Sequence, residues 1–168
     1  MTRALIPATL LVSLALLAGC KKEEAPVEAA PVALVAPTNG DDAAWKEYLG
    51  KVVGQNQAGV TDRTFPYYLP LNSDQVTESD ADGRSQYARQ LENVTNVVQR
   101  TVLPGNMLAF GSPDSAKMAD LVTMAFTDAD PNALKGSQVL FIGKAEDSER
   151  VKAAVEAAGA RYIFGEAK

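Results

Sequence analysis

The sequence contains no histidine and only one cysteine, Cys20, among its 168 residues. Without histidine the chain cannot form a Ser-His-Asp triad, and it lacks both the commonest general base and the usual imidazole metal ligand. A single cysteine cannot form a disulfide within the chain, so the fold must be stable without covalent cross-links. These absences exclude enzymes that depend on a catalytic histidine and metal sites built from imidazole ligands.

Positive charge is also scarce. The chain has 16 lysines and arginines against 21 aspartates and glutamates, which gives a formal net charge of −5. This acidic balance argues against a surface for nucleic acid or for an anionic membrane. Glycine-rich nucleotide-binding fingerprints do not occur either. We therefore expect no nucleic-acid partner and no cofactor.

The N-terminal residues combine a basic start with an apolar run. Arg3 precedes an apolar stretch over residues 4–17, which is too short for the roughly 20 residues of a membrane-spanning helix. The sequence Leu-Ala-Gly-Cys follows over residues 17–20 and resembles the lipobox of bacterial lipoprotein precursors. The resemblance implies a signal peptide over residues 1–19 and lipid attachment at Cys20. An uncleaved membrane helix is the alternative, but it does not explain the small residues before the cysteine.

Residues 20–40 contain Pro26, Pro31 and Pro37 and show no helical stripe. This composition predicts a flexible, semi-extended tether. Lys21 follows the cysteine directly, and lipoproteins that lack aspartate at this place are usually passed to the outer membrane. The resemblance therefore implies a protein anchored in the outer membrane by lipid, which faces the periplasm.

Residues 41–168 show the periodicity of one α/β domain. Helices are expected over about residues 41–53 and 84–102, followed by strands over 107–110, 138–142 and 161–164 that alternate with helices over 113–126 and 147–158. Short, nearly continuous apolar strands that alternate with helices favour a parallel sheet. We expect a small, mainly parallel sheet of three or four strands, βαβαβ in the C-terminal half, covered by the N-terminal helices.

Aromatic residues gather in the first half of this domain. Residues 65–70 read Phe-Pro-Tyr-Tyr-Leu-Pro, and the prolines favour an edge strand or an ordered loop. Trp45 and Tyr48 lie on the apolar stripe of the first helix, where core packing is the default. Because adjacent residues of an extended chain point in opposite directions, we expect one of Tyr67 and Tyr68 to face outward. A sugar- or peptide-binding face is the functional alternative for these aromatics.

Two strand-to-helix junctions resemble each other. Each has a glycine, then an Asp-Ser pair, a variable residue, a base and an apolar residue, with one residue inserted in the second. At the carboxyl edge of the sheet both would present backbone N–H groups to a small anion or a nucleotide-like ligand. The candidate binding residues are Gly111, Ser112, Ser115, Gly143, Lys144 and Ser148. In the simpler interpretation they only start helices, with Ser112 as N-cap and Pro113 first in its helix.

Two other patterns of acidic residues invite a chemical interpretation. Glu78, Asp80 and Asp82 have the spacing of the first half of a calcium loop. Arg89 stands where the bidentate glutamate should be, so a loop that leads into the next helix is the simpler interpretation, and we expect no metal site. Paired carboxylates could also support glycoside hydrolysis, but the sequence identifies no such pair, and we expect no catalytic residue.

Residues 140–164 resemble half of a SPOR domain, a small peptidoglycan-binding module in which an apolar strand and a glycine lead into an alanine-rich helix and a last strand. The resemblance implies peptidoglycan as a partner. We therefore expect a non-enzymatic binding or envelope-assembly lipoprotein, whose partner is an envelope protein or peptidoglycan. A small-anion or nucleotide-like ligand is the alternative, and a carboxylate-dependent envelope hydrolase ranks below it.

Overall fold

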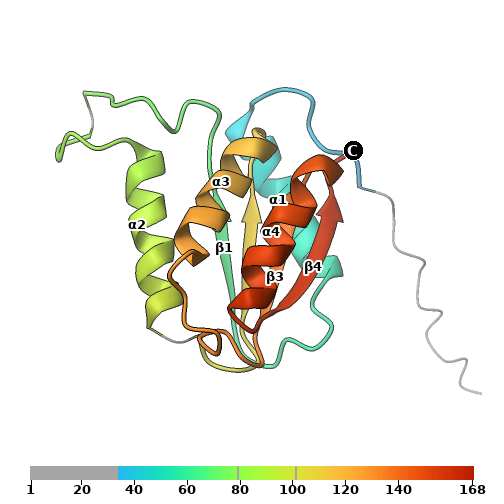
Figure 1. Ribbon diagram of the computed structural model, residues 1–168. Helices are drawn as coiled ribbons and strands as arrows, with labels where there is room; N and C mark the ends of the chain where they lie inside the picture. The colour runs from blue at the N-terminus through green and yellow to red at the C-terminus, as the bar shows by residue number, and fades with distance from the viewer. Residues whose placement is uncertain (1–33, 79, 101) are drawn as a thin grey trace, which may run out of the picture. The chain divides into compact units, whose positions relative to one another are not determined.

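The computed structural model describes residues 34–78, 80–100 and 102–168 (Figure 1). Cys20, the predicted signal peptide and the first part of the predicted tether lie outside these residues. The described residues belong to one compact unit, Pro31–Lys168. Within it, none of the described helices is both long enough and apolar enough to cross a bilayer.

The fold is α/β with four parallel strands, as predicted. The strands are β1 (Thr64–Tyr68), β2 (Met107–Gly111), β3 (Gln138–Gly143) and β4 (Arg161–Glu166). They pair in chain order, β1-β2-β3-β4, and every pair is parallel. β1 is therefore an edge strand, and it contains Pro66. The βαβαβ order predicted for the C-terminal half is confirmed.

The helices are α1 (Asp42–Gln55), α2 (Gln86–Gln99), α3 (Ser115–Phe126) and α4 (Ala145–Ala157). Figure 1 shows α2, α3 and α4 on one face of the sheet and α1 behind it. The N-terminal helices were expected to cover the sheet, and in the structure they do so on opposite faces, α1 on one and α2 on the other. Because α2 connects β1 to β2, it lies beside α3, and among the described helices only α1 covers the opposite face.

The two faces of the sheet have separate cores. In β2 and β3 successive side chains alternate between them, and every residue of both strands is buried. Toward α2, α3 and α4 lie Leu108, Phe110, Val139 and Phe141; toward α1 lie Met107, Ala109, Leu140 and Ile142. Burial on both faces is why these strands read as nearly continuous apolar runs. Trp45 and Tyr48 lie in the α1 core, as predicted.

Residues 34–40, predicted as the end of the tether, contact this domain. Leu34 and Ala36 pack against the α1 core. The buried indole Nε1 of Trp45 donates a hydrogen bond to the carbonyl oxygen of Asn39 at 2.8 Å. The N–H of Ala36 donates to the carbonyl oxygen of Lys168 at 2.6 Å. A buried indole N–H requires an acceptor, which explains why this segment follows the surface of the domain.

Leu49 of α1 sits directly over Gly111 at the end of β2. A Cβ added at Gly111 would lie 2.2 Å from Cδ2 of Leu49, whereas a Cβ at Gly50 would meet nothing within 4 Å. The approach of α1 to the sheet therefore depends on the missing side chain at Gly111.

This contact predicts opposite effects for two glycine substitutions. Gly111→Ala should lower the free energy of unfolding by about 1–3 kcal/mol, because the added methyl overpacks a closed contact. Gly50→Ala should raise it by about 0.5–1 kcal/mol, because alanine restricts the unfolded chain and favours the helix. Urea unfolding measures both. Equal stability of Gly111→Ala and the unsubstituted chain would contradict this seating of α1.

Candidate functional site

The two predicted junctions lie side by side because β2 and β3 are neighbours. Gly111 ends β2 and is paired with Ile142, the residue before Gly143. Ligands in doubly wound folds bind in a crevice where the strand order reverses. The order β1-β2-β3-β4 does not reverse, so the junctions meet outside any crevice of that kind.

A hydrogen-bond network joins the two junctions. The hydroxyl Oγ of Ser115 donates to Oδ2 of Asp147 at 2.6 Å and accepts from the backbone N–H of Lys144 at 2.8 Å. Nη2 of Arg150 donates to Oδ1 of Asp147 at 2.8 Å and to the carbonyl oxygen of Ala116 at 2.9 Å. The start of α3 is thereby tied to the start of α4, and the Ser115 hydroxyl is engaged on both sides within the chain.

Asp147 is the most buried carboxylate of this network, with 6% of its surface exposed. Burial alone would raise its pKa, but hydrogen bonds from Ser115 and Arg150, with the positive charge of Arg150, outweigh burial and lower the pKa below its ordinary value. Asp147 is therefore an ionised anchor at neutral pH, which fits a structural role better than proton transfer.

Two other candidates, Ser112 and Ser148, are also engaged locally. Ser112 Oγ accepts from the N–H of Asp114 at 3.0 Å, and Asp114 accepts from the N–H of Lys117 at 3.0 Å. The prediction that Ser112 caps the helix is therefore wrong, since Asp114 is the N-cap and α3 begins two residues after Pro113. The hydroxyl of Ser148 is 2.9 Å from that of Tyr162.

Gly143 gives Ser115 the room to make its two hydrogen bonds. A Cβ at Gly143 would lie 2.6 Å from Ser115 Oγ and 2.7 Å from the ring of Phe141. The glycine that the sequence suggested for a ligand is thus required for contact with another part of the same chain.

Three of the six candidate residues line a pocket of about 220 Å³. They are Ser112, Ser115 and Lys144, and Lys168 closes the pocket beside them. Nζ of Lys144 is 3.8 Å from Glu146, and Nζ of Lys168 is 2.7 Å from Glu166. Lys168 is therefore paired with a carboxylate, whereas the Lys144 ammonium is exposed, has only a 3.8 Å contact and is the group of this pocket more open to an anion.

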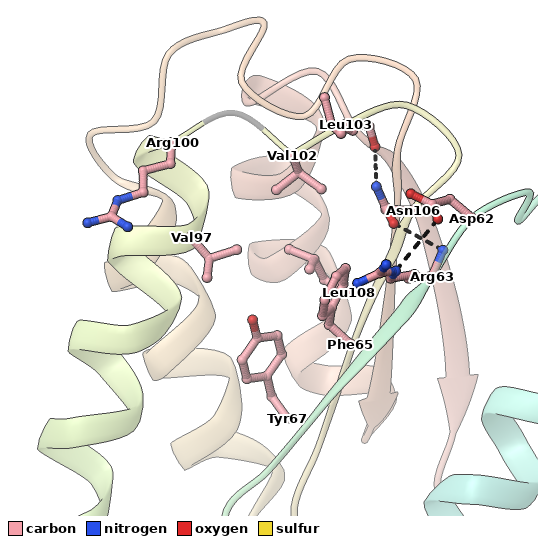
Figure 2. Close-up of a pocket in the computed structure, with 10 residues that line it drawn as sticks. All are labelled: Asp62, Arg63, Phe65, Tyr67, Val97, Arg100, Val102, Leu103, Asn106 and Leu108. Atoms are coloured by element: carbon pink, nitrogen blue, oxygen red, sulfur yellow. Dashed lines mark hydrogen bonds and ion pairs between the residues drawn. The ribbon is translucent and has the colours of Figure 1, made fainter.

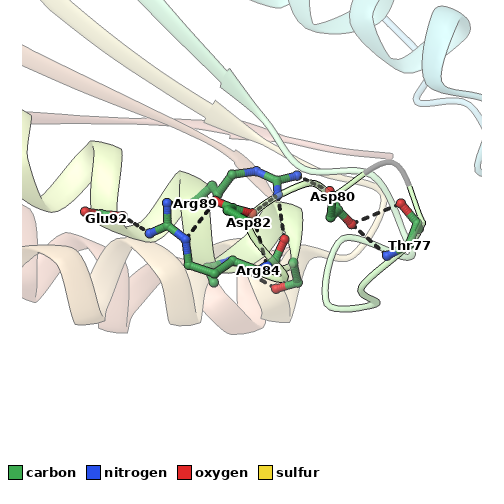
Figure 3. A network of polar contacts seen from close by, with 8 residues as sticks. Thr77, Asp80, Asp82, Arg84, Arg89 and Glu92 are labelled. Atoms are coloured by element: carbon green, nitrogen blue, oxygen red, sulfur yellow. Dashed lines mark hydrogen bonds and ion pairs between the residues drawn. The ribbon is translucent and has the colours of Figure 1, made fainter.

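The acidic loop before α2 binds arginines (Figure 3). Asp82 accepts from Nε of Arg84 at 2.9 Å and from Nη1 of Arg89 at 3.1 Å, and Asp80 also pairs with Arg89. A hydrogen bond from the N–H of Thr77 and the pairing with Arg89 lower the pKa of Asp80. Arg89 thus supplies the positive charge that the calcium interpretation assigned to a metal. In the described part of the chain no cluster of three or more potential metal ligands occurs.

A glycosidase general acid needs a carboxyl group with a raised pKa. The described carboxyls with a displaced pKa all lie below their ordinary values, because each accepts hydrogen bonds from a cation, a hydroxyl or an N–H group. They are Glu47, Asp74, Asp80, Asp82 and Asp147. No observation therefore favours the hydrolase alternative.

A larger hollow, which we call the β1 groove, lies between α2 and β1 (Figure 2). Its volume is about 490 Å³, within the range of ligand sites. The lining residues are Asp62, Arg63, Phe65, Tyr67, Val97, Arg100, Val102, Leu103, Asn106 and Leu108. Phe65 is 39% exposed and Leu103 is 64% exposed. The groove therefore presents apolar surface to water.

No known family matches this chain: protein-family profiles, curated proteins and solved structures all give no match.

Tyr67 supplies a hydroxyl to the β1 groove. Its ring stacks on Phe110 at 5.0 Å between ring centroids, and only 8% of the residue is exposed. Figure 2 shows the hydroxyl directed into the space beside Val97, and it forms no hydrogen bond with any described residue. Burial raises the pKa of Tyr67, so the group is a neutral O–H donor at physiological pH.

Two arginines border the groove. Asn106 Oδ1 accepts from the backbone N–H of Arg63 at 3.0 Å, and Asn106 Nδ2 donates to the carbonyl oxygen of Leu103 at 2.9 Å, which fixes this end of the groove. Nε of Arg63 is 3.8 Å from a carboxylate oxygen of Asp62, and 76% of the arginine side chain is exposed. Arg100 forms no ion pair with a described residue.

The aromatic stretch over residues 65–70 was the sequence signal for this groove, since Phe65 and Tyr67 both line it. Tyr68 is half-buried on the opposite face, where its hydroxyl donates to Asp42 at 2.8 Å and Lys46 lies 5.3 Å from its ring centroid. The two side chains point in opposite directions, as predicted, but neither faces outward: Tyr68 packs against the α1 core, and Tyr67, which lines the groove, is only 8% exposed. The space beside it depends on where α2 packs, which local periodicity does not report.

The Asp147 network predicts a pH-dependent effect. Because the folded-state pKa lies below the unfolded value of about 3.9, ionised Asp147 adds stability above about pH 4, and this contribution is lost as pH falls through the folded pKa. Asp147→Asn should lower the free energy of unfolding by about 1–3 kcal/mol at pH 7. Urea unfolding at pH 7 and below pH 4 should show this difference shrinking, with Glu146→Gln as an exposed control. A difference that is constant with pH would contradict the assignment.

Proposed function

We propose that this protein is a non-catalytic binding module, anchored by lipid at Cys20 in the outer membrane and facing the periplasm. The observation that supports binding is the β1 groove. Exposed apolar surface in a hollow is unfavourable in water and typical of contact sites. The lipobox-like residues before Cys20 support the anchor.

The partner we propose first is an envelope protein. Exposed Phe65 and Leu103 offer the apolar anchor points that protein interfaces use. Peptidoglycan is the other envelope partner, and the SPOR-like stretch over residues 140–164 favours it. The same experiment separates the two.

The test is to produce the full chain in a bacterium with two membranes, with photo-crosslinking p-benzoylphenylalanine in place of Leu103. The chain should incorporate labelled palmitate, fractionate with the outer membrane and form an adduct on illumination. Cys20→Ser should lose the label and the sorting, because the acylated thiol is gone. Protease digestion identifies an adduct with protein, and lysozyme digestion identifies one with peptidoglycan.

The same photoreactive residue in place of Val76 is the matched control, because Val76 is 57% exposed and does not line the groove. It should give no adduct, or a different one. Unchanged sorting of Cys20→Ser would refute the lipid anchor. Absence of any adduct specific to position 103 would refute binding through the groove.

The pocket beside Ser112, Ser115 and Lys144 supports a second candidate function, the binding of a small anion. Lys144 and Lys168 both border this pocket. Inorganic phosphate should then raise the melting temperature beyond the general stabilisation that this salt gives. The extra rise should disappear in Lys144→Glu and persist in Lys152→Glu. Identical phosphate responses in all three chains would refute this candidate.

A further inference from the structure

We propose that the β1 groove binds an extended peptide segment in which apolar side chains are flanked by carboxylates. This inference rests on the proposed function, since it gives the chemistry of the partner for the same groove. Three features carry it: an apolar wall, a Tyr67 hydroxyl that has no hydrogen-bond partner among the described residues, and two border arginines without a close carboxylate partner.

The apolar wall comes from three elements. Phe65 projects from β1, Val97 from α2 and Leu108 from β2, and Leu103 extends the apolar surface beyond the end of the groove. A partner that covers Phe65 and Leu103 removes apolar surface from water, which is the main source of favourable free energy in such contacts.

The Tyr67 hydroxyl distinguishes a peptide from a hydrocarbon. An acyl chain in the groove would displace water from this O–H without offering an acceptor, and a buried donor without a partner is costly. A peptide carries a carbonyl oxygen at every residue and can accept this hydrogen bond. Stacking on Phe110 already fixes the ring, so little side-chain freedom is lost on binding.

The charge at the border is positive in an otherwise acidic chain. Arg84, Arg89 and Arg150 are paired with carboxylates of their own chain. Arg63 has only the 3.8 Å contact with Asp62, and Arg100 has no ion pair with a described residue. Guanidinium groups without a close partner favour ligands that bring carboxylates.

The edge of β1 indicates how the peptide would lie. Arg63 accepts from the N–H of Met107, and Leu69 donates to the carbonyl oxygen of Gly111. Both residues therefore direct backbone groups toward β2. In a parallel pair alternate residues of a strand do this, so Pro66 directs its nitrogen away from β2, to the free edge. Proline has no N–H to donate, so an added strand would lack a central hydrogen bond. The peptide is therefore held by the groove rather than as a fifth strand.

The test uses residues 20–168 with Cys20→Ser, which contain the compact unit Pro31–Lys168. The probe is a capped fluorescent peptide with leucine, phenylalanine and leucine between two pairs of glutamates. Fluorescence anisotropy should show it binding about tenfold or more tightly than the same peptide with lysines in place of the glutamates. Tyr67→Phe should weaken binding about three- to tenfold, and Arg63→Glu about tenfold or more.

Matched controls keep the result specific. Val76→Asp and Arg161→Glu alter exposed residues outside the groove and should leave the affinity unchanged. Thermal unfolding should show that Tyr67→Phe is folded, since it removes only an unpaired hydroxyl. Equal affinity for both peptides, or insensitivity to Tyr67→Phe and Arg63→Glu, would overturn the proposal.

Three further outcomes separate this proposal from a hydrocarbon site and from the proposed function. Displacement of the peptide by laurate with full retention of affinity in Tyr67→Phe would assign the groove to hydrocarbon instead. If no peptide binds while the adduct at position 103 forms in cells, the peptide proposal fails and the binding module stands. If neither occurs, both fail.

Discussion

The packing of α1 on the face of the sheet opposite α2, α3 and α4 is the constraint on which the rest of the structure depends. Because the strands pair in chain order, α2, α3 and α4 all lie on one face. A parallel sheet needs both faces buried, and α1 provides the other cover by packing Trp45, Tyr48, Leu49 and Val52 against β2 and β3, with Leu49 close over Gly111. Without α1, the apolar side chains of β2 and β3 on that face would meet water.

The same arrangement accounts for the β1 groove. α2 is the outermost of the described helices in its layer and packs along α3, so no described helix lies on its other side. Tyr67 and Phe65 of the edge strand are left beside that uncovered side (Figure 2). The groove is thus a product of strand order, and the residues that line it come from distant parts of the sequence.

Apolar runs bounded by glycine identified the central strands, and the spacing of apolar residues identified the helices. Both signals are local, because burial on both faces of a strand or on one face of a helix sets the pattern of neighbouring residues. Contacts between segments that are distant in the sequence leave no such local pattern. Gly111 was expected at a ligand, yet the close neighbour is Leu49. Ser112 and Asp114 are both good capping residues, and the local sequence does not decide between them. The β1 groove depends on the distance between α2 and β1, which no periodicity encodes.

The hydrogen bond between Ala36 and Lys168 has a directional consequence. Lys168 follows β4, whose ladder continues through Ala167 to Gly143, so the chain enters the described domain beside one edge of the sheet. The β1 groove lies at the opposite edge. A tether attached ahead of residue 34 would therefore hold the domain at the β4 edge and leave the β1 groove on the side away from the attachment point.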